Sequence, residues 1–144
     1  MFGKIYLIKC KINNLLYIGS TIRQLDVRMK QHMRDMYKYT NFKLYQAMTE
    51  FEPNNFNIYL LEEFEYIDVK ELRRREGKYI KIIRPLLNTY IAGRTLKEYN
   101  EDNKESLKLY RKLYYRKYRE AHKEKLKKYR KDYYISKKMI LFQP

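Results

Sequence analysis

Two short apolar runs open the chain, and a polar pair typical of a turn separates them. The runs span residues 5–8 and 15–18, and two asparagines lie between them at 13–14. Asparagine is favoured in tight turns because its short polar side chain tolerates left-handed backbone. The pattern therefore predicts a β-hairpin. Each strand carries one tyrosine, Tyr6 and Tyr17, and we expect the two to lie in register across the hairpin.

The apolar positions as far as residue 93 predict the remaining elements of a domain. Their spacing indicates helices over 25–36, 43–51 and 69–83, and a strand over 56–64 with a largely buried centre. Pro53 and Pro85 end the second and third helices. This order of elements predicts an α+β domain over residues 1–93, in which helices flank a small antiparallel three-stranded sheet.

The composition changes after this domain. By count along the sequence, residues 96–144 hold 16 Lys or Arg against 7 Asp or Glu, and 8 of the 17 tyrosines. The segment also repeats itself, because residues 99–115 match 118–134 at 11 of 17 positions with an offset of 19. In a straight helix this offset rotates the second copy by about 100°. We therefore expect a basic helical tail over 94–144 that presents a winding aromatic face or breaks between the copies.

The charge balance narrows the classes of partner. The formal net charge is +16, which favours polyanions, with nucleic acid first and an anionic membrane surface second. The membrane is the weaker alternative, because the tail carries Tyr and Lys where an interfacial helix carries Leu, Phe and Trp. No apolar run approaches the roughly 20 residues of a membrane span, and the N-terminus lacks a long apolar secretion segment. We expect a soluble intracellular protein that is not secreted.

The residue inventory also restricts the metals that the chain can bind. One cysteine and two histidines are too few for a zinc cluster of sulfur and imidazole ligands, so carboxylates must hold any metal, which favours Mg²⁺. Glu76 is the candidate, because it falls near the middle of the apolar stripe of the predicted helix 69–83. A buried carboxylate needs a partner. Glu76 therefore either pairs with a cation such as Arg28 or binds a metal ion.

Arg28 and His32 form a second candidate pair. They are four residues apart in the predicted helix 25–36 and share the edge of its apolar stripe. One interpretation is a boundary arginine beside a partly buried, hydrogen-bonded histidine. The other is a functional pair that faces a cleft.

Taken in order, the candidate residues resemble a known nuclease family. The matching features are KIY at 4–6, YIGST at 17–21, Arg28, His32, Glu76 in RREGKYI, and Asn88 in PLLN. This ordered set is similar to that of the GIY-YIG nucleases over about residues 3–93. The first motif departs from the family pattern, since Lys4 occupies its glycine position and Gly3 directly precedes it.

The resemblance implies an endonuclease that hydrolyses double-stranded DNA with one bound Mg²⁺ or Mn²⁺. The implied roles are that Tyr6 and Tyr17 line the site, Arg28 neutralises the phosphate, His32 assists proton transfer or positions a tyrosine, and Glu76 holds the metal ion. Gly19 and Asn88 would brace or contact the backbone. A tyrosine of ordinary pKa costs about 4 kcal/mol to deprotonate at pH 7. We expect Arg28, a metal ion and Arg23 or Lys30 to lower this cost.

The tail is expected to add affinity for nucleic acid. Its candidate phosphate-binding residues are Lys108, Arg111, Lys112, Lys127, Arg130 and Lys131. A solvated charged helix, or a helix packed on the domain, remains an alternative for this segment. For the whole chain, the alternative to an enzyme is a non-catalytic nucleic-acid-binding protein that keeps the same scaffold. The abundance of Lys, Asn, Ile and Tyr is typical of an A+T-rich genome, such as that of a virus or mobile element.

Overall fold

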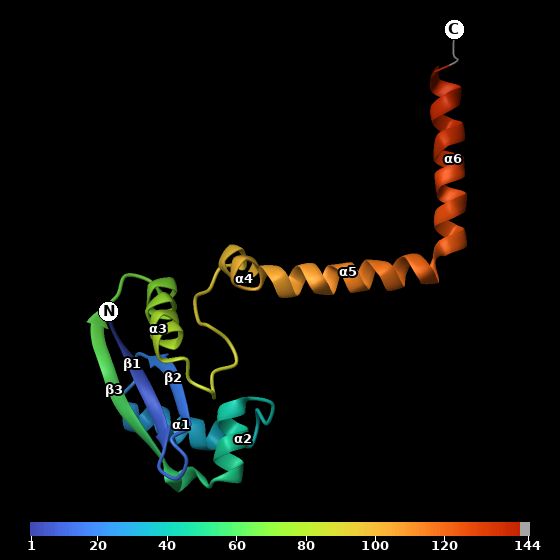
Figure 1. Ribbon diagram of the computed structural model, residues 1–144. Coiled ribbons are helices and arrows are strands. Elements are labelled where there is room, and N and C mark those ends of the chain that lie inside the picture. The colour runs from blue at the N-terminus through green and yellow to red at the C-terminus, as the bar shows by residue number, and fades with distance from the viewer. Residues whose placement is uncertain (142–144) are drawn as a thin grey trace. The chain divides into compact units, whose positions relative to one another are not determined.

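The computed structural model describes the backbone of residues 1–141 and the side chains of residues 1–137. Contacts within the chain divide it into two units, Met1–Thr95 and the residues from Leu96 onward (Figure 1). The division lies close to the predicted boundary after residue 93. Each unit is described separately below.

A three-stranded antiparallel sheet forms the centre of the first unit. Strands β1 (Phe2–Cys10), β2 (Leu16–Thr21) and β3 (Phe56–Glu65) are arranged in the order β2-β1-β3. The α+β fold predicted from the sequence is therefore confirmed, as is the hairpin.

The predicted register of the two tyrosines is wrong. Tyr6 pairs with Gly19, and Tyr17 pairs with Ile8. The tyrosines are therefore diagonal neighbours on one face of the hairpin, with ring centroids 6.4 Å apart. Glycine opposite Tyr6 leaves room for this diagonal contact.

Helices cover both faces of the sheet (Figure 1). Helices α1 (Leu25–Asp35) and α2 (Lys43–Glu50) pack on the face that carries Tyr6, Ile8 and Cys10. Helix α3 (Val69–Ile83) packs on the opposite face, against Ile5 and Ile18. Side chains of β1 are therefore buried on both faces, and this central strand anchors two separate apolar clusters.

Two predicted burial patterns differ from the structure. The centre of β3 is not largely buried, since Tyr59 and Leu60 are each 47% exposed. The reason is the strand order, because β3 lies at an edge of the sheet and receives less cover than β1. In α3, Leu72 and Ile80 are buried but Val69 is exposed, so the apolar stripe is covered only along its middle.

Local sequence signals set the ends of α3. Asp68 caps the N-terminus by accepting a hydrogen bond from the Glu71 backbone N–H at 2.7 Å. At the other end, Arg84 adopts a left-handed conformation and Pro85 follows, which prevents the helix from continuing. The short connection between α2 and β3 is a 3-10 turn at Pro53–Asn55.

The second unit is helical. It contains α4 (Leu96–Asp102), α5 (Lys104–Ala121) and α6 (Lys123–Leu141), with breaks at Asn103 and His122. Of the two predicted alternatives, a winding aromatic face and a helix break, the structure has the break. The breaks fall at the fifth position of each repeat copy and not between the copies. No helix in the part of the chain that the structure describes is long and apolar enough to cross a membrane.

Candidate active site

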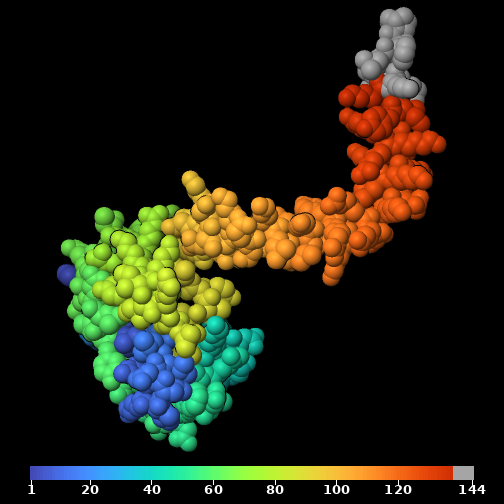
Figure 2. All heavy atoms as spheres, viewed as in Figure 1, coloured from blue at the N-terminus to red at the C-terminus, as the bar shows by residue number. Residues whose placement is uncertain are grey.

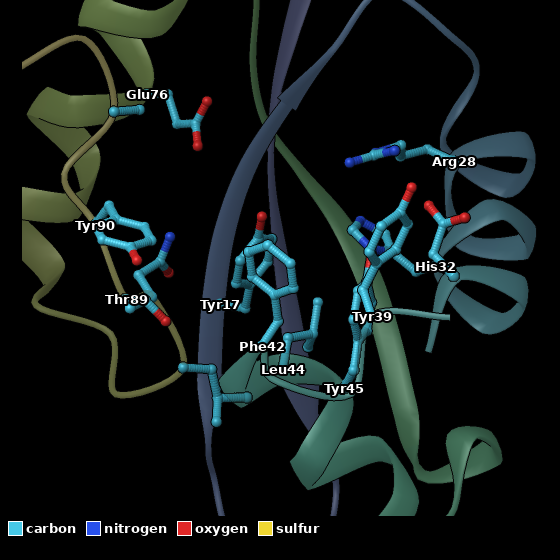
Figure 3. A pocket seen from close by; sticks show the side chains of 14 residues that line it. Tyr17, Arg28, His32, Tyr39, Phe42, Leu44, Tyr45, Glu76, Thr89 and Tyr90 are labelled. Carbon is cyan, nitrogen blue, oxygen red and sulfur yellow. The ribbon is translucent and has the colours of Figure 1, made fainter. Parts of the chain in front are cut away.

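The candidate site lies along the free edge of β2. In the described sheet this strand pairs only with β1, so helices from both faces of the sheet can bring side chains to its outer edge. Helix α1 brings Arg28 and His32 from one face, and α3 brings Glu76 from the other, with Tyr17 between them (Figure 3). Residues that are far apart in the sequence thus face a common space.

A chain of hydrogen bonds connects α1, β1 and α2 beneath this space. The Arg28 Nε–H donates to the Tyr6 hydroxyl at 3.0 Å, and that hydroxyl lies 2.8 Å from His32 Nε2. On the far side of the imidazole, Nδ1 lies 3.1 Å from the Tyr45 hydroxyl. Tyr6 and His32 are buried, so each of these polar groups depends on its partners in the chain.

One assignment gives every buried polar group in this chain a partner. Arg28 can only donate, so the Tyr6 oxygen accepts from it, and in this assignment the Tyr6 O–H donates to His32 Nε2. The imidazole then carries its proton on Nδ1 and donates to Tyr45. This assignment leaves the Tyr45 O–H directed away from His32, and Tyr45 lines the cavity described below.

The hydrogen-bond partner of Glu76 is a neutral hydroxyl. The ion pair with a cation such as Arg28, one of the two predicted alternatives, is not formed. The Ser20 hydroxyl donates to Glu76 Oε2 at 2.6 Å. Arg73 and Arg28 act on the Glu76 carboxylate as nearby charges, and neither forms an ion pair with it. Burial raises the pKa of the Glu76 carboxyl, which the Ser20 hydrogen bond, Arg73 and Arg28 partly oppose. The structural ion pair with Arg28 is therefore absent.

Asn88 closes the free edge of β2. Its side chain accepts from the Ile18 N–H and donates to the Ile18 carbonyl, both at 2.8 Å. The neighbouring Leu87 N–H donates to the Leu16 carbonyl at 3.1 Å. The segment that follows α3 is therefore attached to β2 as an extra strand would be, and it forms one wall of the site.

Gly19 permits the close approach of the two tyrosines. A Cβ atom at this position would clash with the Tyr6 hydroxyl and would lie 3.0 Å from a ring carbon of Tyr17. The position is buried on β2, opposite Tyr6. Any larger residue would push the Tyr6 hydroxyl away from Arg28 and His32.

These elements enclose a cavity of about 370 Å³ (Figure 3). Five predicted site residues line it: Tyr17, Arg28, His32, Glu76 and Asn88. Tyr6 and Gly19 are not part of the lining and lie beneath it. Arg23 and Lys30 are exposed and outside the cavity, so the structure does not bring them to the predicted site.

The electrostatics of the site are dominated by burial. Burial raises the pKa of Tyr6 to about 12, although Arg28 lowers it, and raises the pKa of Tyr17 further. Deprotonating Tyr6 at pH 7 therefore costs about 7 kcal/mol in the protein alone. Arg28 lowers the pKa of both tyrosines, as expected, but burial outweighs it, so the net pKa shift of each tyrosine is upward. Burial and Arg28 lower the pKa of His32 to about 3, so the imidazole is neutral.

Comparison with known proteins identifies the family. The family model described as the GIY-YIG catalytic domain matches residues 2–91. The chain belongs to the GIY-YIG family. The resemblance predicted from the sequence is thus confirmed.

Two solved structures of one endonuclease are similar to this GIY-YIG domain. The chain is 30% identical to a variant of the catalytic domain of the intron endonuclease I-TevI, with a TM-score of 0.53, over 66% of this chain and 98% of that one. A second structure, the catalytic domain of the homing endonuclease I-TevI, is also 30% identical, with a TM-score of 0.50 over 61% and 95% of the two chains.

A viral protein is also related in sequence. An MSV199 domain-containing protein of Invertebrate iridescent virus 6 is 35% identical over 79 residues, which are 55% of this chain. The match spans 32% of the length of that protein. The two are therefore compared over one region only.

Sequence reasoning missed two residues that hold the site together. Ser20 belongs to the matched YIGST segment, but its role depends on α3 lying against the strand face opposite to Tyr17. Tyr45 sits on α2, and its bond to His32 depends on how α1 and α2 pack. Tyr45 falls within the predicted helix 43–51, and nothing in the sequence marked its hydroxyl.

Proposed function

We propose that this protein is a metal-dependent endonuclease that hydrolyses phosphodiester bonds of double-stranded DNA. One observation carries the proposal. A half-buried carboxylate, Glu76, faces the same cavity as a guanidinium, Arg28, without forming an ion pair with it. A phosphodiester and a hard cation between them would satisfy both charges.

The residues present suit a single Mg²⁺ or Mn²⁺ ion. Glu76 would hold the ion, since its carboxylate faces the cavity and has Ser20 as its hydrogen-bond partner. The described residues contain no cluster of three or more His, Cys, Asp or Glu that could enclose a metal. Mg²⁺ is commonly bound by one or two carboxylates together with waters and substrate phosphates. When bound, such an ion supplies Lewis-acid stabilisation of the charge on the phosphate.

Arg28 is suited to bind the scissile phosphate. Its Nε–H is already held by the Tyr6 hydroxyl, so the guanidinium is fixed in orientation and its remaining N–H groups are available to phosphate oxygens. A guanidinium fixed in this way stabilises negative charge that develops during hydrolysis without having to reorganise.

The tyrosines and the histidine are suited to orient the reacting groups. Tyr17 lines the cavity, where it would contact the attacking water or the phosphate. Tyr6 lies beneath the cavity and is hydrogen-bonded to both Arg28 and His32, so it would hold the guanidinium and the imidazole in position. Separate Phe variants of Tyr6 and Tyr17 test these two roles.

The related proteins support DNA as the substrate. The matched solved structures are catalytic domains of a protein named as an intron and homing endonuclease. The viral relative and the A+T-rich type of composition support a viral or mobile-element origin.

The test is cleavage of a supercoiled plasmid at low salt with Mg²⁺, Mn²⁺ or EDTA. Wild-type protein should nick or linearise the plasmid with either metal and leave it intact in EDTA. Glu76→Gln, which keeps the side-chain volume, should abolish cutting, whereas the exposed Glu50→Gln should cut normally. A wild-type protein that binds the plasmid but never cuts it would favour the non-catalytic alternative.

A further inference from the structure

The helical tail contains the same joint twice. Asn103 and His122 are 19 residues apart and have nearly the same backbone angles, φ −113° and ψ 17° against φ −115° and ψ 21°. The Asn103 side chain donates to the Tyr99 carbonyl at 2.8 Å, and His122 Nδ1 bonds the Tyr118 carbonyl at 2.9 Å. The sequence repeat is therefore also a structural repeat.

Each joint ends one helix and begins the next in the same way. The backbone N–H of Leu107 donates to the Asn103 carbonyl at 2.9 Å, and that of Leu126 donates to the His122 carbonyl at 2.9 Å. Leu107 and Leu126 are half-buried, like the two joint residues, while nearly all other described positions of the tail are exposed. We call α5 and α6, each with its preceding joint residue, the two tail modules.

The two modules carry the same basic face. Counted from each joint, cations recur at the first, fifth, eighth and ninth helical positions, which lie on one side of a helix. The pairs are Lys104 and Lys123, Lys108 and Lys127, Arg111 and Arg130, and Lys112 and Lys131. Because the helix restarts at His122, each copy keeps its own complete face.

An aromatic face lies beside the basic face in both modules. It consists of Leu107, Tyr110 and Tyr114 in the first module and Leu126, Tyr129 and Tyr133 in the second. The tyrosines of these faces are at least half exposed, and Figure 2 shows the side chains of α5 projecting along the length of the helix. Rings of Tyr110 and Tyr114 stack with an interplanar angle of 20°.

We propose that the tail is a tandem of two equivalent modules, each of which binds the phosphate backbone of a DNA duplex through its basic face. This deepens the proposed function, on which it rests for the choice of DNA as partner. Lysine and arginine neutralise phosphates, and neighbouring tyrosine hydroxyls donate to phosphate oxygens. An 18-residue helix such as α5 is about 27 Å long, which matches roughly 8 base pairs at 3.4 Å each.

Equivalence of the two modules gives the proposal a sharp test. Three full-length variants each replace three cations by Gln, which retains good helix propensity. The first changes Lys108, Arg111 and Lys112, and the second changes Lys127, Arg130 and Lys131. The matched control replaces Lys117, Lys125 and Lys128 by Gln. It removes the same amount of charge, but these three lysines lie off the basic face. Circular dichroism checks that each variant keeps its helix content.

Binding to a duplex is measured in EDTA over a range of salt concentrations, so that no cleavage occurs. Both module variants should weaken binding by a similar factor, at least about tenfold near 0.1 M salt, and should reduce the log–log salt slope by about 3. The control variant should change the affinity and the slope clearly less. A control effect as large as the module effects, or an effect of one module alone, would overturn the proposal.

The same samples separate this inference from the proposed function. If wild-type protein binds duplex as described in EDTA but does not cut with Mg²⁺ or Mn²⁺, the endonuclease proposal fails and the modules stand. If the module variants bind duplex as wild type does but lose binding to vesicles of phosphatidylserine, the partner of the basic faces is a membrane and the inference is wrong. A loss of self-association without a loss of duplex binding would overturn it in favour of a second copy of the chain.

Discussion

The two units of this protein organise functional side chains in opposite ways. In the GIY-YIG domain each group occurs once, is wholly or partly buried, and is held by specific partners, as Tyr6 is by Arg28 and His32. In the two tail modules the cations of the basic face are exposed and occur in two copies. A substitution in the domain should therefore cause a large loss of cleavage rate. A substitution in the tail should lower the affinity for DNA by a small, additive amount.

Arg28→Lys is expected to give the largest loss of cleavage rate, and it should act on the GIY-YIG domain and not on the tail. Lysine keeps the charge but cannot both donate to Tyr6 and present a planar pair of N–H groups to phosphate. The cleavage rate at saturating DNA should fall by about 100-fold, close to 3 kcal/mol. Single-turnover kinetics measure this rate, with Arg34→Lys, exposed on the same helix, as the control. Equal rates for the two variants would remove Arg28 from the mechanism.

Gly19→Ala tests whether close packing beneath the cavity supports its chemistry. The added methyl group would overlap the Tyr6 hydroxyl, and overpacking of this kind destabilises by about 1–3 kcal/mol. We expect a lower melting temperature together with a lower cleavage rate, measured by calorimetry and plasmid nicking. A variant that melts and cuts like wild type would show that the Tyr6 hydroxyl has room to move.

Tyr45→Phe tests how much the hydrogen-bond chain from Arg28 to Tyr45 contributes to stability and activity. Phenylalanine removes the partner of His32 Nδ1 and leaves a buried N–H unsatisfied, at a cost of about 1–3 kcal/mol. Unfolding in urea measures the loss of stability, and nicking assays should show a reduced rate. Tyr37→Phe is the matched control, because that tyrosine is 80% exposed. Similar stabilities for both variants would contradict the hydrogen-bond assignment.

Acid titration distinguishes the buried imidazole from the exposed cations. Burial and Arg28 lower the pKa of His32 in the folded protein to about 3 from an ordinary 6.5. Between these values the unfolded chain binds a proton that the folded protein does not, so stability falls as the pH falls from about 6.5 to 3. The slope from this group is at most about 1.4 kcal/mol per pH unit. Urea unfolding of His32→Gln across this range should lack that component, and an unchanged slope would contradict the assignment.

A single change in the tail should have the smallest effect. Lys127→Gln removes one of several equivalent cations, so the log–log salt slope of duplex binding should fall by about 0.9 or less and the affinity by a few-fold. Fluorescence anisotropy with a labelled duplex measures both quantities. A drop in affinity as large as that of the whole module variant would show that one lysine dominates and that the tail is not additive.

The sequence predicted the helices and strands of the domain better than it predicted which residues come together at the site. The apolar spacing of α1 and α3 is strong, so their boundaries were predicted to within one residue. The convergence of Arg28 and Glu76 depends on β2 being an edge strand that helices on both faces of the sheet reach, and no local pattern encodes strand order. The exposed centre of β3 was mispredicted for the same reason.

The joints of the tail show a different limit. The repeat was visible in the sequence, but the position of the break depends on the side chains of Asn103 and His122, each of which bonds a carbonyl one turn earlier. Asparagine is common at helix ends but histidine is not, so the repeated break is not evident from the two residue types. Only the structure shows that they serve the same purpose at the same place in the two copies.

The most direct test of this account is single-turnover cleavage of one duplex in Mg²⁺ over a range of protein concentrations. It compares wild type, Glu76→Gln, and a tail variant in which Lys108, Arg111, Lys112, Lys127, Arg130 and Lys131 are all Gln. The account predicts that Glu76→Gln loses the maximal rate, while the tail variant reaches the wild-type maximal rate at much higher protein concentration. Cleavage by Glu76→Gln at the wild-type rate, or no cleavage by wild type, would contradict it.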